Sequence, residues 1–425
     1  MYPTPDSSPR PWIEIPADSD FTLQNFPFGI FETGTLGARA ATAIGDFVVD
    51  LAAMQELRYF DDLHLPRGIF EQPYLNDFIA LGPATWRAVR KRLIALFSTD
   101  GPGALRNYPD SQDEVLHPHS EVRMRMPVYV RDYTDFYSSE EHATNVGTMF
   151  RGKENALMPN WKHLPVAYHG RASSIVVSGT PVRRPWGQLK PGDGDPVHAP
   201  SRLLDFELEM GAIIGQGNAL GEPIPTAQAE DHIFGLLLFN DWSARDIQKW
   251  EYVPLGPFLG KNFASSVSPW IVTLDALAPF RVPGPKQDPP VLPYLRAEGD
   301  RNFDIQLEVA IEVPGYPEQV VCRSNHRYLY WSLAQQIAHH ASGGCNLQVG
   351  DLLASGTISG PTPDSYGSML ELSWRGSKPL SMPDGSERRF LQDGDVVIMR
   401  AFAAKEGLRV GFGEVRTEIL PALEG

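Results

Sequence analysis

The chain has 425 residues, which is too long for a single ordinary hydrophobic core. Two domains, or one large domain with an appendage, are therefore expected. Its apolar fraction of 42% is enough for a sizeable interior, and 38 Gly with 38 Pro favour a turn-rich, mostly β fold. The formal net charge of -15 argues against nucleic acid or an anionic membrane as the main partner. A small anionic substrate is not excluded, because a local Arg/Lys cluster can outweigh the total.

Cysteine content and apolar runs both favour a cytoplasmic protein. Cys322 and Cys345 lie in no CxxC pair, and we expect both to be buried, reduced thiols. The N-terminal residues MYPTPDSSPRPW contain no apolar segment of the kind that a signal peptide needs. The longest apolar runs, such as LLLF at 236–239, are far shorter than a membrane span.

The first part of the chain predicts a small β domain with a helix. After a polar lead-in over residues 1–20, segments 28–31 and 40–51 are predicted strands, with a hairpin turn at Gly45-Asp46. Segment 83–97 has Pro in its first turn and an apolar stripe with a 3.6-residue period, so it is predicted to be a helix.

A polar segment, 107–121, separates this unit from the rest. His117 and His119 are two residues apart and could bind a metal on a strand face, but beside Pro118 solvent exposure is the better interpretation. We therefore interpret the segment as a linker and divide the chain into domains 1–118 and 119–425.

Segment 132–151, DYTDFYSSEEHATNVGTMFR, concentrates groups that enzymes use. It combines Asp135, Tyr137, His142 and Arg151 with aromatic residues and a predicted Gly-Thr turn. Asp135 is a candidate metal ligand, His142 a candidate base and Arg151 a candidate anion clamp. Taken alone, His142 is also consistent with a surface histidine in a polar loop, and Arg151 with an ordinary ion pair.

Segment 201–210, SRLLDFELEM, alternates as a strand does. One face carries Phe206, Leu208 and Met210, and the other carries Asp205, Glu207 and Glu209. Three carboxylates on one face repel each other unless they are solvated or share a cation. Segment 303–313 alternates in the same way with nothing around it that suggests a site, so alternation alone does not separate the two interpretations.

The next candidate groups follow a buried strand predicted at 233–239. That strand ends at Asn240-Asp241 and is followed by a helical pattern that places Arg245, Gln248 and Tyr252 on one face. Asp241 could be only the helix N-cap. A strand-end acid before a helix face with these polar groups is nevertheless typical of ligand sites in sheet proteins.

The rest of the chain contributes isolated candidates. Segments 166–169, with Tyr168, and 174–178 are predicted strands, while the turn-rich segment 187–200 is a predicted loop. Lys261 lies in a loop that lacks the glycine spacing of a phosphate-binding loop. A short helix is predicted at 332–341, and the last strands flank a hydroxyl turn with Thr357 and include Glu371.

Several of these strings together resemble the fumarylacetoacetate hydrolase family in its long two-domain form. The matching stretches include DYTDFYSS with HATNVG, MFRGKENAL, YHGRASSIVVSGTP, RLLD with ELEM, NDWSARDIQ with WEYVPLGPFLGK, and GDLLASGTISGP with GSMLELSW. They cover nearly the whole chain, including PWIEIPADSDFTLQNFPFGIF near its start, and motifs this long and numerous are specific.

The resemblance implies a mostly β protein, with a small SH3-like β-barrel N-terminal domain, a large C-terminal mixed β-roll and a homodimer. It also implies an activity: metal-dependent hydrolysis of the carbon–carbon bond of 4-fumarylacetoacetate, a β-diketone, to fumarate and acetoacetate. This reaction ends tyrosine and phenylalanine catabolism through homogentisate.

Carried over by motif, the metal ligands would be Asp135, Glu207, Glu209 and Asp241, with Lys261 (through its backbone) and Ser265 at a second cation position. Carboxylate-rich oxygen ligation suits Ca²⁺ or Mg²⁺, with Mn²⁺ as an alternative. The chain departs from the mammalian pattern at KNFASS, where Ala264 and Ser265 replace Gly and Thr. Serine keeps the hydroxyl group of that position.

Hydrolysis of a 1,3-diketone needs an activated water, a stabilised oxyanion and a protonated leaving group. His142 fits the base, Glu371 fits its orienting partner, and Arg245, Gln248 and Lys261 fit the donors. The resemblance assigns substrate binding to Tyr137, Arg151, Tyr168, Gln248, Tyr252 and Thr357. Two alternatives stay open: a sister enzyme that cleaves or hydrates another oxo-acid, and a non-catalytic metal- or ligand-binding protein on the same scaffold.

Overall fold

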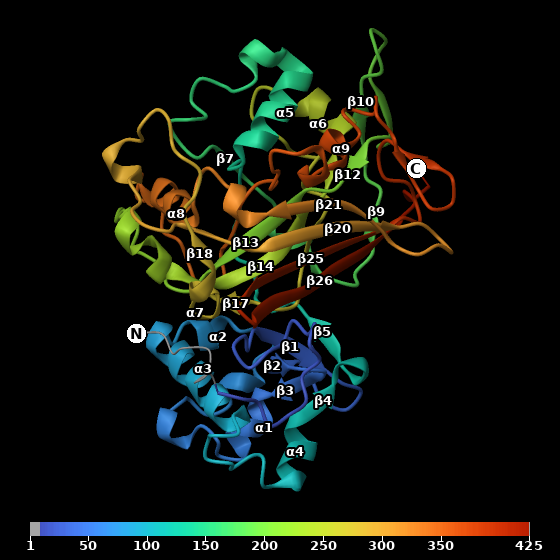
Figure 1. Ribbon diagram of the computed structural model, residues 1–425. Helices are drawn as coiled ribbons and strands as arrows, with labels where there is room; N and C mark the ends of the chain where they lie inside the picture. The colour runs from blue at the N-terminus through green and yellow to red at the C-terminus, as the bar shows by residue number, and fades with distance from the viewer. Residues whose placement is uncertain (1–8, 425) are drawn as a thin grey trace.

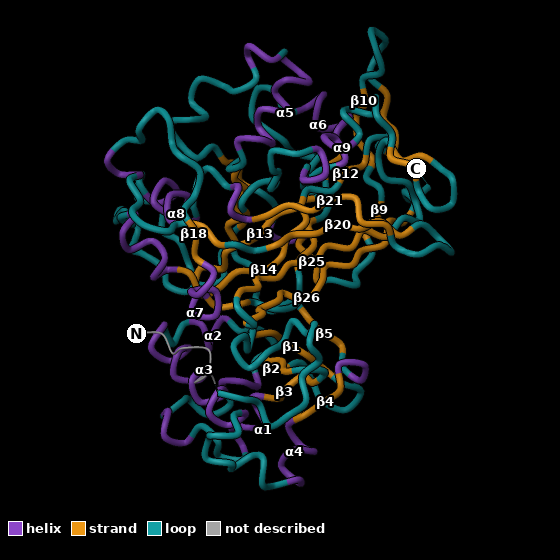
Figure 2. Tube along the Cα trace, in the orientation of Figure 1, coloured by secondary structure: helices purple, strands orange, loops and turns teal. Residues whose placement is uncertain are grey.

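The structure is a computed structural model that describes residues 9–424, so residues 1–8 of the expected polar lead-in lie outside the described residues. A smaller unit from the N-terminal part of the chain sits against a larger unit formed by the rest (Figure 1). Strands are concentrated in the middle of the larger unit, with helices and loops around them (Figure 2). The mostly β, two-unit organisation expected from the sequence is therefore present.

The N-terminal unit contains a five-stranded antiparallel sheet. Its strand order is β4 (Leu116–Pro118), β3 (Phe47–Asp50), β2 (Arg39–Ile44), β1 (Phe28–Glu32) and β5 (Arg123–Arg125). Its helices are α1 (Leu51–Glu56), α2 (Asn76–Ile79), α3 (Pro83–Phe97) and α4 (Pro109–Val115). The predicted hairpin between β2 and β3 is confirmed, with Gly45 at a positive φ of 55° that favours glycine. The helix predicted at 83–97 is confirmed as α3 and buries its apolar stripe.

The polar segment 107–121 is not the linker that its composition suggested. Pro109 occupies the first turn of α4, and the segment then continues as β4, which pairs with β3. His117 and His119 are half-buried against aromatic rings rather than exposed: His117 packs on Phe31 and His119 stacks on Phe21. Composition missed this because the contacts that bury the segment come from distant residues.

The larger unit is organised around an eight-stranded mixed sheet. Along its main path the order is β7 (Ala167–His169), β6 (Tyr133–Phe136), β22 (Leu352–Ala354), β13 (Leu208–Ile214), β14 (Ile233–Asp241), β16 (Ser265–Val267) and β8 (Ile175–Val177), and β17 (Val272–Thr273) also pairs with β14. A five-stranded sheet contains β21 (Gln319–Asn325), β20 (Gln306–Glu312), β25 (Val396–Lys405), β26 (Leu408–Leu420) and β9 (Val182–Arg183).

Short ladders and helices complete the larger unit. The ladders are β10 (Trp186–Leu189) with β11 (Val197–Pro200), β12 (Leu204–Asp205) with β15 (Ser243–Ala244), β18 (Arg281–Val282) with β19 (Asn302–Phe303), and β23 (Leu380–Ser381) with β24 (Glu387–Arg388). The helices are α5 (Glu140–Arg151), α6 (Arg245–Glu251), α7 (Leu274–Leu277), α8 (Leu333–Ala341) and α9 (Met369–Leu372). The predicted helix at 332–341 is confirmed as α8, with Ser332 as its N-cap.

Three local predictions in this unit are wrong. Segment 187–200 forms the β10–β11 hairpin rather than a loop, because its Gly-Pro-Asp run is the turn between two strands. Glu371 lies on α9 rather than on a strand, since Ser368 caps that short helix. The Gly-Thr pair in segment 132–151 is not a turn but lies inside α5, where Gly147 leaves room for the carbonyl of Ala156.

Two further expectations, one on the cysteines and one on the cap of α6, differ from the structure in part. Cys322 is buried, but Cys345 is exposed, so only one thiol is the buried core residue that was expected. Helix α6 begins after Ala244, so Asp241 is not its N-cap. The carboxylate of Asp241 is therefore left for another role.

The main sheet has an apolar core on each face. Leu208 and Met210 of β13 point into the core of the larger unit. Ile213 of the same strand points to the opposite face, into a core shared with the N-terminal unit, where the indole of Trp86 meets the ring of Phe234 edge-on at 5.0 Å between centroids. Odd-numbered positions of β13 therefore face the N-terminal unit, and the predicted acidic positions are odd-numbered too.

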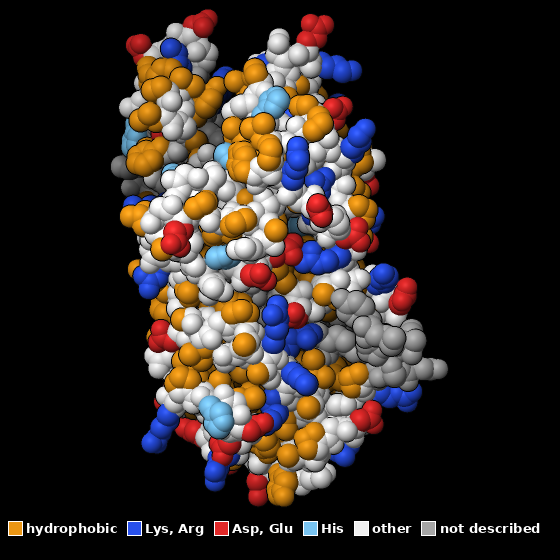
Figure 3. Space-filling model, turned by 90° about the vertical axis from the view of Figure 1, so that its left-hand side faces the viewer, with side chains coloured by type: hydrophobic (Ala, Val, Ile, Leu, Met, Phe, Trp, Pro, Cys, Tyr) orange, Lys and Arg blue, Asp and Glu red, His pale blue; other side chains and the backbone are white. Residues whose placement is uncertain are grey.

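The surface carries charges of both signs. On the face shown in Figure 3, acidic and basic side chains are interspersed rather than gathered into one basic area. Among residues 9–424, no helix has the length and apolar character needed to cross a membrane.

Candidate active site

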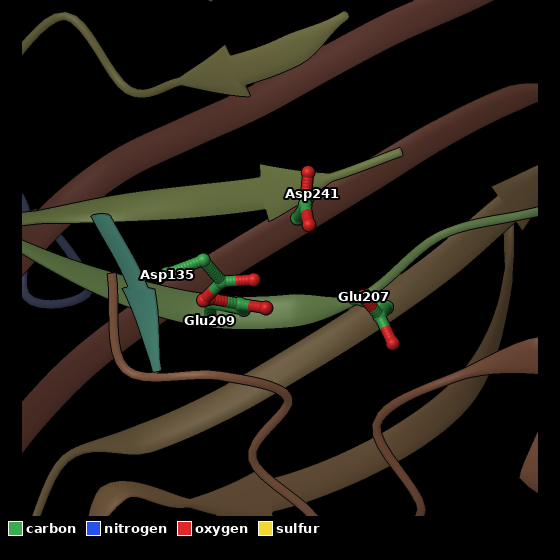
Figure 4. Close-up of side chains that lie close together, drawn as sticks. All are labelled: Asp135, Glu207, Glu209 and Asp241. Atoms are coloured by element: carbon green, nitrogen blue, oxygen red, sulfur yellow. The ribbon is translucent and has the colours of Figure 1, made fainter. Parts of the chain in front are cut away.

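Four acidic side chains meet at one end of the main sheet. Asp135 lies on β6, and Asp241 ends β14. Glu207 comes directly before β13, and Glu209 is the second residue of that strand. All four are buried, and one carboxylate oxygen of each lies within 4.8 Å of the others. Figure 4 shows the carboxylates of Asp135 and Glu209 next to each other, with Asp241 reaching in from the neighbouring strand. The alternating acids Glu207 and Glu209 therefore belong to a buried cluster and not to a solvated strand face.

This cluster fits a hard cation. Asp135 Oδ1 and Glu209 Oε1 are buried and have no hydrogen-bond partner among the described residues. Burial, reinforced by Asp241, raises the pKa of Asp135 well above its ordinary value, and burial with Asp135 does the same to the pKa of Glu209. Buried carboxylates without donors are stable only when protonated or when they share a cation. An all-oxygen ligand set of this kind suits Ca²⁺ or Mg²⁺.

Lys261 reaches the same cluster with its side chain. Its ammonium group contacts a carboxylate oxygen of Glu207 and lies 2.7 Å from Asp241 Oδ2. Burial lowers the pKa of Lys261, but Asp241 and Glu207 outweigh it and raise that pKa above its ordinary value. Ser265, opposite Asp241 on β16, has its hydroxyl 3.3 Å from Asp241 Oδ1. Lys261, predicted to act through its backbone, therefore also holds a fixed positive charge at the cluster.

His142 and Glu371 form a buried pair. His142 Nδ1 lies 2.7 Å from Glu371 Oε2, although the two residues are 229 positions apart. The same oxygen accepts from the hydroxyls of Ser359 and Ser368 at 2.9 Å each, and Oε1 accepts from Asn145 Nδ2 at 2.9 Å. Burial raises the pKa of Glu371, yet His142 and these donors bring it below its ordinary value. Glu371 is thus an ionised acceptor that holds Nδ1 of His142 in place.

Arg245 connects this pair to the cluster. Its Nη2 is 2.7 Å from Glu207 Oε1, the oxygen that also lies 3.6 Å from His142 Nε2. Its Nε is 2.7 Å from Asp205 Oδ2, and Nη1 donates to Gln248 Oε1 at 3.3 Å. Burial raises the pKa of Glu207, but Arg245 and Lys261 bring it below its ordinary value. The predicted base and cationic donors therefore surround one carboxylate.

Three predicted substrate residues lie near this centre. The hydroxyl of Tyr168 donates to Asp241 Oδ2 at 2.7 Å. The ring of Tyr137 meets the imidazole of His142 edge-on, 5.1 Å between centroids. Thr357 is buried in the turn after β22, the strand that pairs with β6 beside Asp135.

Gln248, also predicted to bind substrate, contacts Arg245 as described above, and the remaining two predicted substrate residues lie further out. Arg151, at the end of α5, donates to the carbonyls of Asn155 and Ala156 and is exposed. Tyr252, at the end of α6, is 50% exposed. Within residues 9–424, neither Arg151 nor Tyr252 forms a hydrogen bond or an ion pair with the carboxylate cluster.

Sequence reasoning missed several polar groups that support the site. Asn145, Ser359 and Ser368 donate to Glu371, and the backbone N–H of Gly356 donates to Glu209 Oε2 at 2.9 Å. Only one had a local signal: Ser368-Met-Leu-Glu371 has the serine and glutamate spacing of a helix capping box. The others are defined by contacts across more than one hundred positions or, for Ser359, by a turn that composition does not specify.

A buried histidine–carboxylate pair beside an acidic cluster that fits a cation is typical of metal-dependent enzymes. Residues 132–420 match the family described as fumarylacetoacetate (FAA) hydrolase C-terminal, and residues 24–127 match the one described as fumarylacetoacetase N-terminal. The chain belongs to the fumarylacetoacetate hydrolase family.

Relatives along the full chain agree with this. A protein of Dictyostelium discoideum named fumarylacetoacetase is 54% identical over 421 residues, 97% of this chain and 98% of that protein. Proteins of that name from Homo sapiens and Arabidopsis thaliana are 53% and 52% identical over 97% of this chain and 99% of each relative. A solved fumarylacetoacetate hydrolase from Exiguobacterium antarcticum matches with a TM-score of 0.52 over 93% of this chain and 99% of that chain. At 18% identity, the last likeness supports the fold alone.

Proposed function

We infer that the protein is a hydrolase that cleaves the carbon–carbon bond of 4-fumarylacetoacetate to give fumarate and acetoacetate, as in tyrosine catabolism. The observation that carries this is the buried His142–Glu371 pair, with 2.7 Å between Nδ1 and Oε2. This pair lies beside a carboxylate cluster that fits a cation. Binding alone needs no oriented base, so this pair favours an enzyme over a binding protein. Full-length similarity to proteins named fumarylacetoacetase favours this diketone over another oxo-acid.

His142 activates water. Because Glu371 accepts the proton on Nδ1, the lone pair of the imidazole is on Nε2, the nitrogen that faces Glu207 at 3.6 Å. A water on that side can pass a proton to Nε2 as its oxygen attacks the substrate carbonyl carbon. Glu371 then stabilises the imidazolium that forms, without itself taking up the proton.

The cationic donors meet the negative charge that develops. Because Gln248 Oε1 accepts from Arg245, the amide nitrogen of Gln248 is left to donate to the oxyanion. Arg245 and Lys261 stay charged when buried, so they stabilise the tetrahedral intermediate electrostatically. When the carbon–carbon bond breaks, its electron pair stays on the acetoacetate carbon, and the His142 imidazolium returns a proton to that carbon.

We assign the ligands of the cation to Asp135, Glu207, Glu209 and Asp241. A bound Ca²⁺ or Mg²⁺, with Mn²⁺ as an alternative, would supply a Lewis acid for the two diketone oxygens. The hydroxyl of Ser265 and the backbone of Lys261 belong to a second cation position. Tyr137, Tyr168 and Thr357 would orient the substrate close to the cluster, and Arg151 and Tyr252 would hold its outer carboxylate.

The test follows the loss of the conjugated-diketone absorbance when purified protein is added to fumarylacetoacetate. We expect decay with fumarate and acetoacetate as products, loss of activity with a chelator, and recovery with Ca²⁺ or Mg²⁺. His142→Ala should stop turnover without changing metal content, while His163→Ala, which changes an exposed histidine, should have no effect. Asp241→Asn should lower metal content. Metal-loaded, folded wild-type protein without turnover would refute the assignment.

We also propose the assembly and location of the protein. A homodimer is supported by exposed hydrophobic side chains at the end of α6 and in the loop that follows it: Trp250, Tyr252, Val253, Leu255, Phe258 and Leu259. Light scattering should then give twice the chain mass of 47.1 kDa. A cytoplasmic location is supported by two cysteines that form no disulfide within residues 9–424.

We further propose that the N-terminal sheet is an SH3-like barrel and that the larger unit is a β-roll. The domain division should lie between residues 126 and 132 rather than at 118, because β5 at 123–125 pairs with β1. The match to the N-terminal family model also ends at residue 127, and the match to the C-terminal model begins at residue 132. Limited proteolysis is expected to cut first near Tyr129, which is exposed.

A further inference from the structure

A further buried carboxylate, that of Asp205, lies beside the site and is not one of the four clustered acids. It is fully buried, and all of its hydrogen-bond partners are donors. Oδ2 lies 2.7 Å from Arg245 Nε and 3.1 Å from the backbone N–H of Leu370, and Oδ1 accepts from the backbone N–H of Met369 at 2.6 Å. One carboxylate thus connects three elements, β12, α6 and α9.

The two groups that Asp205 connects belong to different parts of the proposed reaction. Arg245 goes on to Glu207 and Gln248, where the oxyanion is expected to form. Met369 and Leu370 form the first turn of α9, and the next residue is Glu371, which holds His142. The side chain of Asp205 therefore gives a second connection between Arg245 and the His142–Glu371 pair, beside the one through Glu207.

A purely structural ion pair elsewhere in the chain shows the contrast. Asp395 is also fully buried, lies 2.9 Å from Arg388 Nε and accepts the backbone N–H of Gln392 at 2.8 Å. Its partners contact none of the groups of the proposed reaction. Asp395 thus matches Asp205 in burial, charge and type of partner, but not in what its partners do.

We propose that Asp205 is a positioning residue of the reaction, which holds Arg245 and the α9 segment bearing Glu371 in one fixed arrangement. This inference rests on the proposed function. Within residues 9–424, Asp205 forms no hydrogen bond with the four candidate cation ligands, so it would act through the residues that it contacts.

Asp205→Asn tests this with little change in size. Asparagine keeps one acceptor oxygen and presents an NH₂ group where the other oxygen accepted. Either Met369 alone, or Arg245 and Leu370 together, then meets a donor in place of an acceptor. We expect kcat to fall about 30-fold, within the 10- to 100-fold typical of outer supporting residues. KM should change less than about threefold, because the interactions lost act mainly in the transition state. Ca²⁺ affinity, measured calorimetrically, should be unchanged.

Asp395→Asn is the matched control. It removes an equivalent buried charge, so it should lower thermal stability by a similar amount and leave kcat at the wild-type value. In the double variant Asp205→Asn/Arg245→Gln, the two kcat losses should be clearly less than multiplicative, because both act through Arg245. Wild-type kcat in Asp205→Asn, or multiplicative losses, would overturn the proposal. Should Asp205→Asn not fold, Asp205→Ser, which leaves room for a water, is expected to show the same loss of kcat.

A spectroscopic measurement separates this inference from the proposed reaction. The proton on His142 Nδ1, hydrogen-bonded to Glu371, should give a downfield resonance in ¹⁵N-histidine-labelled protein that His142→Ala removes. Asp205→Asn should shift or broaden it, and Asp395→Asn should not. Absence of wild-type turnover would refute the reaction, and the resonance would still decide the positioning: an unchanged signal in Asp205→Asn refutes it.

Discussion

The charge of Glu371, rather than the shape of its hydrogen-bond network, is expected to set the rate, and Glu371→Gln separates the two. Its Oε2 accepts from His142 and two serines, while Oε1 accepts only from Asn145. A glutamine can place its oxygen at the Oε2 position. Its NH₂ group then faces Asn145, whose amide can rotate to present its oxygen instead. The network survives and one negative charge is lost.

The size of the effect follows from the 2.7 Å contact between His142 Nδ1 and Glu371 Oε2. Two full charges about 4 Å apart interact by about 4 kcal/mol at an effective dielectric constant near 20. The attraction is complete only when the imidazolium has formed, so its loss raises the barrier more than it weakens substrate binding. At about 1.4 kcal/mol per factor of ten, kcat should fall by roughly a thousandfold with KM little changed.

The assay compares Glu371→Gln with Glu371→Ala by diketone absorbance and urea unfolding. Alanine leaves the donors of His142 and Asn145 buried without an acceptor, at about 1–3 kcal/mol each, so only alanine should lower stability strongly. In a His142→Ala background, adding Glu371→Gln should cause no further loss of kcat. A Glu371→Gln enzyme within threefold of wild type, or a further loss in that background, would refute the reasoning.

Three further outcomes are expected. The imidazole of His326 is buried and has no hydrogen-bond partner within residues 9–424, and burial lowers its pKa to about 4. As the pH falls, the unfolded chain therefore takes up the proton first, and the free energy of unfolding measured in urea should fall from pH 6.5 toward pH 4, by about 2 kcal/mol at pH 5. His326→Leu should not show this fall. Gly356→Ala should lower metal content, measured by atomic emission, because φ is 77° and a Cβ would lie 2.3 Å from the carbonyl of Phe136 beside Asp135. Because the pKa values of Asp135 and Glu209 are raised, metal binding near pH 7 should release protons, and metal affinity should weaken as the pH falls. Calorimetry in buffers of different ionisation enthalpy measures this release, and equal heats in all buffers would contradict it.

The acidic candidates could be found because part of their signal is local. Glu207 and Glu209 alternate with apolar residues and Asp241 ends an apolar strand, so the pattern marked them as candidates, while the full set with Asp135 came from the family resemblance. What alternation could not decide was whether that face was solvated. Segment 303–313 alternates as well, and Glu308 and Glu312 in it pair with exposed arginines at the surface. Burial depends on which element packs above the face, and that element comes from another part of the chain.

The supporting groups could not be predicted, with one exception. Asn145 contacts Glu371 across 226 positions and Gly356 contacts Glu209 across 147, so no local pattern encodes them. Asp205 alternates like Glu207, yet an isolated strand gives no sign that it turns toward α9. Ser368 is the exception, since its capping-box spacing to Glu371 predicts a helix where an apolar-rich string suggested a strand.

The shared sheet face explains how a buried, charged site is tolerated. Glu207 and Glu209 continue the same side of β13 that carries Ile213, and Asp241 continues the side of β14 that carries Phe239. The apolar end of this face is covered by the N-terminal unit, whose Phe28 also exchanges backbone hydrogen bonds with Ile271 at 2.8 and 2.9 Å. Apolar burial there, about 25 cal/mol per Å², offsets the desolvation of the carboxylates at the other end. The N-terminal unit therefore stabilises the same sheet face whose other end carries the four acidic side chains.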